Sequence, residues 1–175
     1  MMSKSCPLAV RPAAPGDEMA VAHVHVRAWQ VGYRGLLSDD YLAGLNPSDR
    51  ARRYTFGDVS PLKPRTFVAI ESGTIVGFAT VAPAVDDDEG KLGELNALYV
   101  DPDSWKKGIG ATLQSAALAA LYESGFRNAM LWVLAANVRA INFYQSQGWR
   151  ADGTSREAEV WGVRVEEKRF IRSLD

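Results

Sequence analysis

Hydrophobic and polar positions in the first third of the chain follow helical spacing more often than strand spacing. Apolar and aromatic residues recur every three or four positions between Asp17 and Tyr33, which is typical of a half-buried helix. Asp17, Ser38 and Asn46 are residue types that cap helices, and Pro47 is favoured in a first helical turn. These signals predict one short strand and three helices, at 8–11, 17–33, 39–45 and 48–54.

The remaining two thirds alternate between strand and helix patterns. Ser72-Gly73 separates two β-rich runs and predicts a hairpin, and Gly148 ends the last helical pattern. The expected strands span 65–71, 74–81, 92–100, 128–134, 149–152 and 160–171, and the expected helices span 108–124 and 137–146. This order predicts an α+β fold with a partly parallel centre, in a single domain that covers residues 1–175.

Composition narrows the class of protein. The chain has 175 residues, 47% of them hydrophobic, and a formal net charge of -1, which favours a globular domain over a disordered or nucleic-acid-binding one. Cys6 is the only cysteine, so an internal disulfide cannot form. No apolar run approaches the roughly 20 residues of a membrane span. We therefore expect a cytoplasmic protein without nucleic-acid or membrane partners.

A glycine-containing turn between a strand and a helix carries the clearest chemical signal. The segment reads Trp105-Lys106-Lys107-Gly108-Ile109-Gly110-Ala111. The first amides of a helix lack internal partners and lie at its positive end, and glycines let a ligand approach the backbone. Together with two lysines, these features suit a pyrophosphate, although a packed junction with solvated lysines is an equal alternative. The glycine spacing fits neither a P-loop nor a dinucleotide fingerprint.

A second constellation lies on the helix expected at 137–146. Asn137 and Tyr144 are seven residues apart, so two helical turns place them on one face. Asn137 could cap the helix or bind a ligand amide, and the Tyr144 hydroxyl could lie beside a leaving group. A core tyrosine with a satisfied hydroxyl is the alternative.

Taken together, the two segments resemble the GNAT acetyltransferase superfamily. In that family a Q/R-x-x-G-x-G/A loop holds the pyrophosphate of coenzyme A, and here Trp105 replaces the Gln or Arg. The Asn137–Tyr144 helix and Gly148-Trp149 complete a resemblance that covers about residues 90–149. It implies the GNAT fold: a mixed, mostly antiparallel sheet of about seven strands with a splayed parallel centre, flanked by about four to five helices.

The resemblance also implies an activity. It is that of an N-acetyltransferase that moves the acetyl group of acetyl-CoA to a primary amine of an unidentified small molecule or peptide. A non-catalytic acyl-CoA-binding sensor is the alternative. No metal is implied; members of the family often pair through their last strands, so a homodimer is one possible state, and the sequence does not determine the oligomeric state. The implied cofactor-binding residues are Leu98, Tyr99, Val100, Lys106, Lys107, Gly108, Ile109, Gly110, Ala111, Asn137 and Tyr144.

Two catalytic residues follow from the same resemblance. Tyr144 is the expected general acid for the thiolate of coenzyme A. Glu94 falls where histone-acetylating members place a catalytic base, and a salt-bridged strand glutamate or a water relay is the alternative. A bulge near Asn96-Ala97 is expected to free a backbone amide of Leu98 or Tyr99 for the acetyl oxygen.

The acceptor amine is expected to meet the early helices, the hairpin and the last strands. Trp29 and Tyr33 are the substrate-binding candidates, with His25, Tyr41 and Trp161 as further members of the pocket. An aromatic core is the alternative for each of them. The acidic segment 86–89 could attract a cationic amine, or could be a solvated loop.

Overall fold

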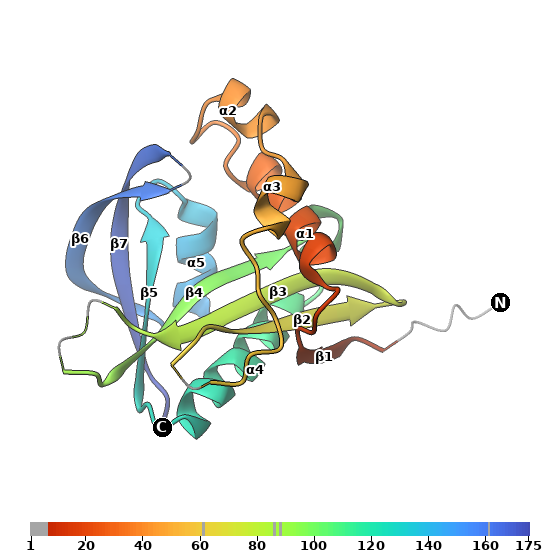
Figure 1. The fold of residues 1–175 in the computed structure, drawn as a ribbon. Coiled ribbons are helices and arrows are strands. Elements are labelled where there is room, and N and C mark those ends of the chain that lie inside the picture. Colours follow the sequence, from red (N-terminus) through yellow and green to blue (C-terminus); the bar gives the residue numbers. More distant parts are fainter. Residues whose placement is uncertain (1–6, 61, 86, 88, 161) are drawn as a thin grey trace.

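The computed structural model describes residues 7–60, 62–85, 87, 89–160 and 162–175. Its strands form one seven-stranded sheet in the order β1-β2-β3-β4-β5-β7-β6 (Figure 1). The strands are β1 (Ala9–Pro12), β2 (Arg65–Glu71), β3 (Thr74–Pro83), β4 (Leu92–Val100), β5 (Asn128–Leu134), β6 (Arg150–Val160) and β7 (Val163–Ser173). All neighbouring strands are antiparallel except β4 and β5, which run parallel at the centre of the sheet.

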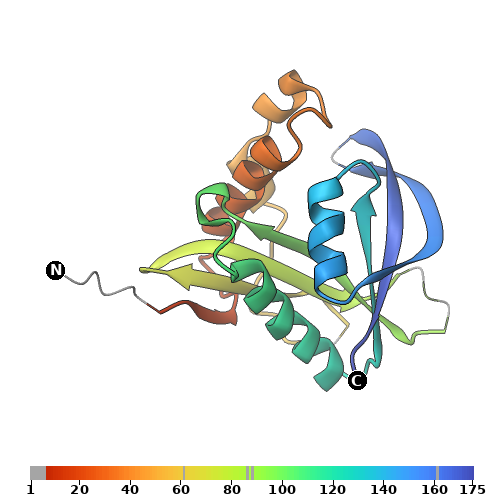
Figure 2. The ribbon, with the colours of Figure 1, turned by 180° about the vertical axis from the view of Figure 1, so that it is seen from behind.

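Helices cover both faces of this sheet (Figures 1 and 2). One face carries the early helices and the other carries α4 and α5. The helices are α1 (Glu18–Gly32), α2 (Asp39–Ala43), α3 (Pro47–Ala51), α4 (Ile109–Glu123) and α5 (Val138–Ser146), with a 3-10 turn, η1 (Pro102–Ser104). Ser38 and Asn46 cap α2 and α3 as their types predict, because their side chains accept from Tyr41 N and Ser48 N.

Alternation along the strands divides the core between the two faces. On β3, Phe78 packs with Val21 and Val24 of α1, whereas its neighbour Ala79 belongs to the cluster under α4. The helical stripe expected on α4 is fully buried in that second cluster: Ile109, Leu113, Ala117, Ala120 and Leu121. The hydrophobic pattern therefore determines which side of α1 and which side of α4 packs against the sheet, and the two helices lie on opposite faces of it.

A bulge interrupts β4 at the expected place. Thr80 of β3 pairs with Ala97, but the next residue, Val81, pairs with Leu95. Asn96 is consequently the extra residue on β4, which confirms the bulge expected near Asn96-Ala97. A bulge bends its strand and increases the local twist.

The parallel contact at the centre of the sheet is short. β4 and β5 pair only from Leu92 opposite Asn128 to Glu94 opposite Met130. The two strands diverge after Glu94, which lies two residues before the bulge at Asn96. In Figure 1, β5 then runs upward and β4 runs to the right. This splay leaves the edge of β4 after Glu94 without a strand partner on the β5 side.

The last two strands differ from the sequence expectation. They form a long hairpin, Arg150–Val160 and Val163–Ser173, where separate strands at 149–152 and 160–171 were expected. β6 is an edge strand, and most of its side chains are exposed or half-buried. Its middle is therefore polar and carries no hydrophobic alternation that would predict a strand.

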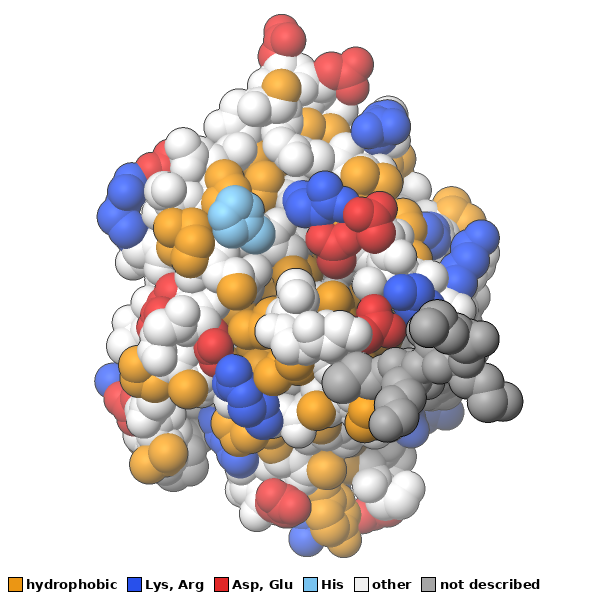
Figure 3. All heavy atoms as spheres, turned by 90° about the vertical axis from the view of Figure 1, so that its right-hand side faces the viewer, with side chains coloured by type: hydrophobic (Ala, Val, Ile, Leu, Met, Phe, Trp, Pro, Cys, Tyr) orange, Lys and Arg blue, Asp and Glu red, His pale blue; other side chains and the backbone are white. Residues whose placement is uncertain are grey.

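The surface of the described chain shows no single dominant charge on the side drawn in Figure 3. Basic and acidic side chains are interspersed there with hydrophobic ones. Among the described residues, no helix combines the length and the apolar character needed to cross a bilayer.

The close approach of α4 to β4 generates a stability prediction. A Cβ atom added at Gly93 would lie 2.7 Å from Cδ2 and 2.8 Å from Cδ1 of the buried Leu121. We expect Gly93→Ala to lower the free energy of unfolding by about 1–3 kcal/mol through overpacking, measured by urea denaturation. The double variant Gly93→Ala/Leu121→Ala should lose less free energy of unfolding than the two single variants lose together, because shortening Leu121 relieves the contact. Simple additivity would contradict the contact.

Candidate active site

A groove of about 430 Å³ lies between the end of β4, the start of α4 and one face of α5. It is lined by most of the loop and helix residues that the sequence singled out. They are Leu98, Val100, Lys106, Gly108, Ile109, Gly110, Ala111 and Tyr144. The structure thus brings the two sequence constellations onto opposite walls of one groove.

The turn into α4 presents backbone amides to this groove. Gly108 is the N-cap residue of α4, with φ of 79°, and Lys106 also has a positive φ of 63°. Within the described part of the chain no side chain caps this helix, and the first amides of a helix have no partner inside it. The positive end of a 15-residue helix therefore opens onto a cavity, an arrangement that binds anions.

The two lysines of the turn differ in position. Lys106 lines the groove, whereas the Nζ of Lys107 lies 3.2 Å from Oε2 of Glu71. Lys107 is not among the described residues that line the groove. One of the two expected cations thus points toward the groove, and the other is used in an ion pair with β2.

Trp105 and Arg139 form a stacked pair at the rim. The indole Nε1 of Trp105 donates to the carbonyl of Val100 at 2.7 Å, and the Arg139 guanidinium lies 3.9 Å from the ring centroid. Both side chains line the groove. Trp105 therefore holds a cation near the position where the family's Gln or Arg would stand. Sequence reasoning missed Arg139, although it lies two residues after Asn137 in the second motif.

A second cavity, of about 210 Å³, occupies the gap between β4 and β5. It shares Leu98, Arg139, Ala140 and Tyr144 with the groove, so the two spaces meet at Tyr144. This second cavity is lined by Trp29, Tyr33, Tyr99 and Asn137, which were expected to lie near the acetyl group or the amine. Asn137 is 5% exposed, and its Oδ1 accepts from Ala140 N at 3.1 Å, which caps α5.

Burial raises the pKa values of the three tyrosines around this gap. For Tyr144 the main cause is desolvation, with a further increase from Tyr99 and a partial decrease from the Arg139 cation. Desolvation also raises the pKa of Tyr99 and Tyr33. All three phenols are therefore protonated at neutral pH and can act as hydrogen-bond donors.

The backbone of β4 offers donors to the gap at alternate residues. Asp101 N donates to Val76 O of β3 at 2.7 Å. Because polar backbone groups alternate sides along a strand, Tyr99 also directs its amide toward β3. Leu98 and Val100 then direct their amides toward the gap. Of the two residues expected to serve the acetyl oxygen, Leu98 has the suitable orientation.

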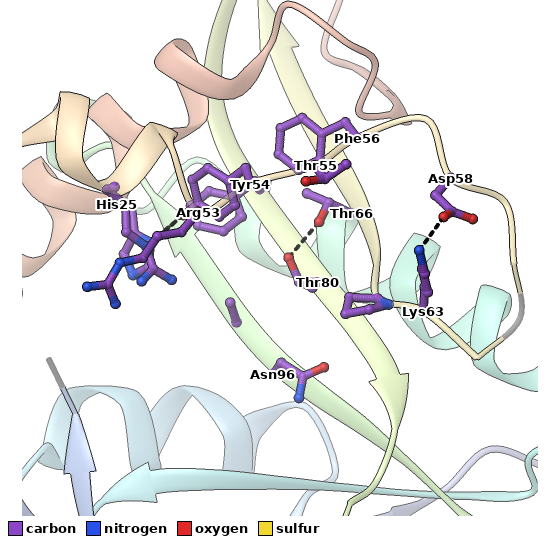
Figure 4. Close-up of a pocket in the computed structure, with 14 residues that line it drawn as sticks. His25, Arg53, Tyr54, Thr55, Phe56, Asp58, Lys63, Thr66, Thr80 and Asn96 are labelled. Atoms are coloured by element: carbon purple, nitrogen blue, oxygen red, sulfur yellow. Dashed lines mark hydrogen bonds and ion pairs between the residues drawn. The ribbon is translucent and has the colours of Figure 1, made fainter.

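A third cavity, of about 480 Å³, lies on the α1 face of the sheet and shares Asn96 and Ala97 with the gap (Figure 4). His25 forms part of its wall and is 4% exposed, with its ring stacked on Tyr99 at 4.6 Å between centroids. Its Nδ1 lies 3.2 Å from the donating Nε of Arg50 and 2.6 Å from the Tyr54 hydroxyl.

Burial, assisted by the Arg50 charge, lowers the pKa of His25 well below its ordinary value. His25 is therefore neutral at pH 7. Because Nδ1 accepts a hydrogen bond from Arg50, the ring proton belongs on Nε2. The three cavities thus adjoin one another through shared lining residues, from the turn of α4, through the gap at Tyr144, to this neutral histidine.

The remaining expected site residues lie further away. Glu94 is 9% exposed and occupies the last paired position of β4, and it is not among the described residues that line the three cavities. Tyr41 lines a separate cavity near α2 and α3, and Trp161 lies outside the described residues. In the acidic segment 86–89, Asp87 accepts from Leu92 N at 2.6 Å and stabilises the local turn, while 86 and 88 are also outside the described residues.

Comparisons with known proteins agree with this geometry. Residues 31–149 match the family described as the acetyltransferase (GNAT) family. The uncharacterized N-acetyltransferase YuaI of Bacillus subtilis is 31% identical over 160 residues, which cover 90% of this chain and 88% of that protein. The mycothiol acetyltransferase of Thermobispora bispora is 36% identical over 91 residues, but these cover 49% of this chain and only 31% of that protein.

A solved structure shows the same fold. The PaiA N-acetyltransferase of Thermoplasma acidophilum, crystallised with coenzyme A, superposes with a TM-score of 0.70 at 20% identity, covering 93% of this chain and 98% of the other. The chain therefore belongs to the acetyltransferase (GNAT) family, and its class is that of acetyl-CoA-dependent N-acetyltransferases. The predicted mixed sheet with a splayed parallel centre is confirmed. No cluster of metal-ligating side chains occurs among the described residues.

The buried histidine predicts a pH-dependent stability. The unfolded chain takes up a proton at His25 below about pH 6.5, whereas the folded protein resists it. The free energy of unfolding should therefore be constant above this pH and fall below it, by up to about 1.4 kcal/mol per pH unit. Guanidinium denaturation at about pH 7.5 and about pH 5.5 measures this difference.

The chain supplies a matched control for this measurement. His25→Gln should flatten the dependence, and the same change at the exposed His23, two residues earlier, should leave it intact. An equal pH dependence in wild type and His25→Gln would contradict the assignment of His25 as a buried neutral group.

Proposed function

We propose that this protein transfers the acetyl group of acetyl-CoA to a primary amine, with the donor in the groove at α4 and the amine entering through the gap between β4 and β5. The observation that carries the proposal is the uncapped N-terminus of α4, which opens onto a groove continuous with that gap. A pyrophosphate suits the first site, and a thioester reaching Tyr144 suits the second.

The donor would be held by backbone groups and by one lysine. The amides of Ile109, Gly110 and Ala111 would bind the pyrophosphate, with Lys106 as a further cation. The backbone of Leu98 and Val100 would bind the pantetheine arm, and the Leu98 amide would donate to the acetyl oxygen, where negative charge develops. Asn137 lines the same gap while it caps α5.

The reaction moves one proton from nitrogen to sulfur. A neutral amine attacks the acetyl carbon, the C–N bond forms, the C–S bond breaks, and the proton lost by the amine ends on the thiolate. Complete proton transfer from Tyr144 is uphill, because its pKa is raised above 10 while a thiol titrates near about 8.5. Tyr144 therefore acts by donating a hydrogen bond to the departing sulfur, and the nearby Arg139 cation adds electrostatic stabilisation.

The base for the amine proton is proposed to act at a distance. Glu94 precedes Asn96 by two residues, which is about 7 Å along a strand. Asn96 lines both the gap and the third cavity. Glu94 can therefore receive the proton through a water bound near Asn96, which combines the candidate base with the expected water relay.

Two broader properties are also proposals. A cytoplasmic location fits the single cysteine of the chain. A homodimer could form along the unpaired edge of β6, since β6 is the outermost strand of the sheet on that side.

Binding of the donor predicts a shift in thermal stability. Coenzyme A at about 100 times its Kd should stabilise the protein by about 2.7 kcal/mol, or about 5–10 °C in Tm, while ATP and NAD should have no effect. Gly110→Asp should abolish the shift by placing a negative charge in the groove. Because a Cβ at Gly110 would lie 3.4 Å from the ring of Phe143, the Tm of the variant without ligand is measured first, to show that it is folded.

The matched control for this test is Ser115→Asp, which adds the same charge to an exposed position of α4 outside the groove. Ser115→Asp should retain the full shift. An unchanged shift in Gly110→Asp would show that the turn does not bind the pyrophosphate.

The role of Tyr144 predicts a kinetic change. Tyr144→Phe should lower kcat about 10- to 100-fold, the value of a hydrogen bond to a charged group, with little change in the KM for acetyl-CoA. Because its pKa is raised, wild-type activity should show no decline due to Tyr144 up to about pH 10. Release of free thiol measures both effects. Tyr122→Phe, at an exposed tyrosine, is the control and should leave kcat unchanged. Binding without thiol release for any amine would instead support the sensor alternative.

A further inference from the structure

The cavity on the α1 face contains more positive than negative charge. Its charged lining residues among those described are Arg50, Arg53, Lys63 and Asp58. Asp58 and Lys63 form an ion pair of 2.7 Å and so neutralise each other. Figure 4 shows this pair at one end of the cavity and Arg53 beside His25 at the other. The excess charge therefore belongs to the arginine end.

The two arginines differ in how far their side chains are already engaged by other residues. Arg50 Nε donates to His25 Nδ1 and lies 3.3 Å from the Tyr54 hydroxyl, both of which are neutral groups. Arg53 is exposed and forms no ion pair within the described part of the chain. Its neighbour Arg52 points elsewhere, since it pairs with Asp49 and does not line the cavity. Arg53 is therefore the cation best placed to bind a ligand.

Another part of the cavity wall adjoins the proposed reaction site. Asn96 and Ala97 line both this cavity and the gap beside Tyr144. The wall also includes the aromatic rings of Tyr54, Phe56 and Phe78. A molecule in the cavity would thus contact Asn96 and Ala97 beside the gap, the aromatic rings, and the guanidinium groups at the arginine end. Its volume of about 480 Å³ suits a small molecule.

We propose, resting on the acetyltransferase function above, that the acceptor is a primary amine that also carries a carboxylate, which Arg53 binds with support from Arg50. A guanidinium presents a planar pair of donors that matches a carboxylate. The same charges disfavour a polyamine, because its second ammonium would lie against the arginines. Neutral His25 adds no further positive charge and helps to orient Arg50.

The experiment compares acceptors that differ only in the anionic group. Thiol release from acetyl-CoA is measured with the twenty L-amino acids and with straight-chain amino acids from glycine to 6-aminohexanoate. Each of these acceptors is compared with its carboxamide. Spermidine is tested as the polyamine. In the longer pairs the amine is too distant for the amide to alter its pKa. We expect kcat/KM to be at least about tenfold higher for the best carboxylate than for its amide, consistent with a charge-assisted hydrogen bond.

Variants test the assignment to Arg53. Arg53→Gln should raise the KM of the carboxylate about 5- to 20-fold with little change in kcat, and should leave the amide unaffected. Arg53→Glu should reverse the preference, and the adjacent Arg52→Gln should behave as wild type. Equal rates for carboxylate and amide, a preference for spermidine, or equal losses for both acceptors in Arg53→Gln would overturn the proposal.

A binding measurement separates this proposal from the proposed activity. With coenzyme A present, the best carboxylate amine, or 5-aminopentanoate if none reacts, should raise the Tm of wild type but not that of Arg53→Gln. Such binding without thiol release would uphold the carboxylate site and reject acetyl transfer. Absence of both turnover and a Tm shift with every carboxylate would overturn the carboxylate site, while the coenzyme A shift would still report on the groove.

Discussion

Three paired positions join β4 to β5, and the site depends on where that pairing stops. The bulge at Asn96 lies two residues after the last pair and bends β4 away, which leaves a gap toward which Leu98 and Val100 direct their backbone amides. The same gap lets Tyr144 of α5 approach β4 from one side and the aromatic rings of α1 from the other. A fully paired sheet would consume these backbone donors and close the space.

Charge is distributed along the cavities in a way that the net charge of -1 conceals. The helix end, Lys106 and Arg139 lie on the donor side, and Arg50 and Arg53 lie on the proposed acceptor side. Between them, burial keeps the tyrosines protonated and the histidine unprotonated, and the buried Glu167 of the gap is paired with Arg156. The proposed reaction thus takes place in a largely buried middle section, where a backbone amide and a phenol are effective donors.

The aromatic wall is part of the core as well as of the cavities. Trp29 and Tyr33 are 3% and 8% exposed, and their rings lie 4.5 Å apart. Replacing either would lower stability as well as alter the space beside it, so a loss of activity in such variants has two explanations. Arg53 lies at the exposed rim, where a substitution changes charge without disturbing packing. Recognition and stability are therefore separable at the rim but not in the gap.

Sequence by itself determined the features that local chemistry encodes: the helical stripe of α4, the caps at Ser38 and Asn46 and the glycine turn at Gly108. Through two motifs it also indicated the family, and the family resemblance in turn predicted the bulge near Asn96. It did not determine the extent of β6, whose edge position permits polar residues, or the outward turn of Lys107 toward Glu71. Arg139 on Trp105 and Arg53 beside His25 likewise required the tertiary structure. Their positions depend on contacts between segments far apart in the chain, and hydrophobic periodicity carries no information about which charged side chains will share a cavity.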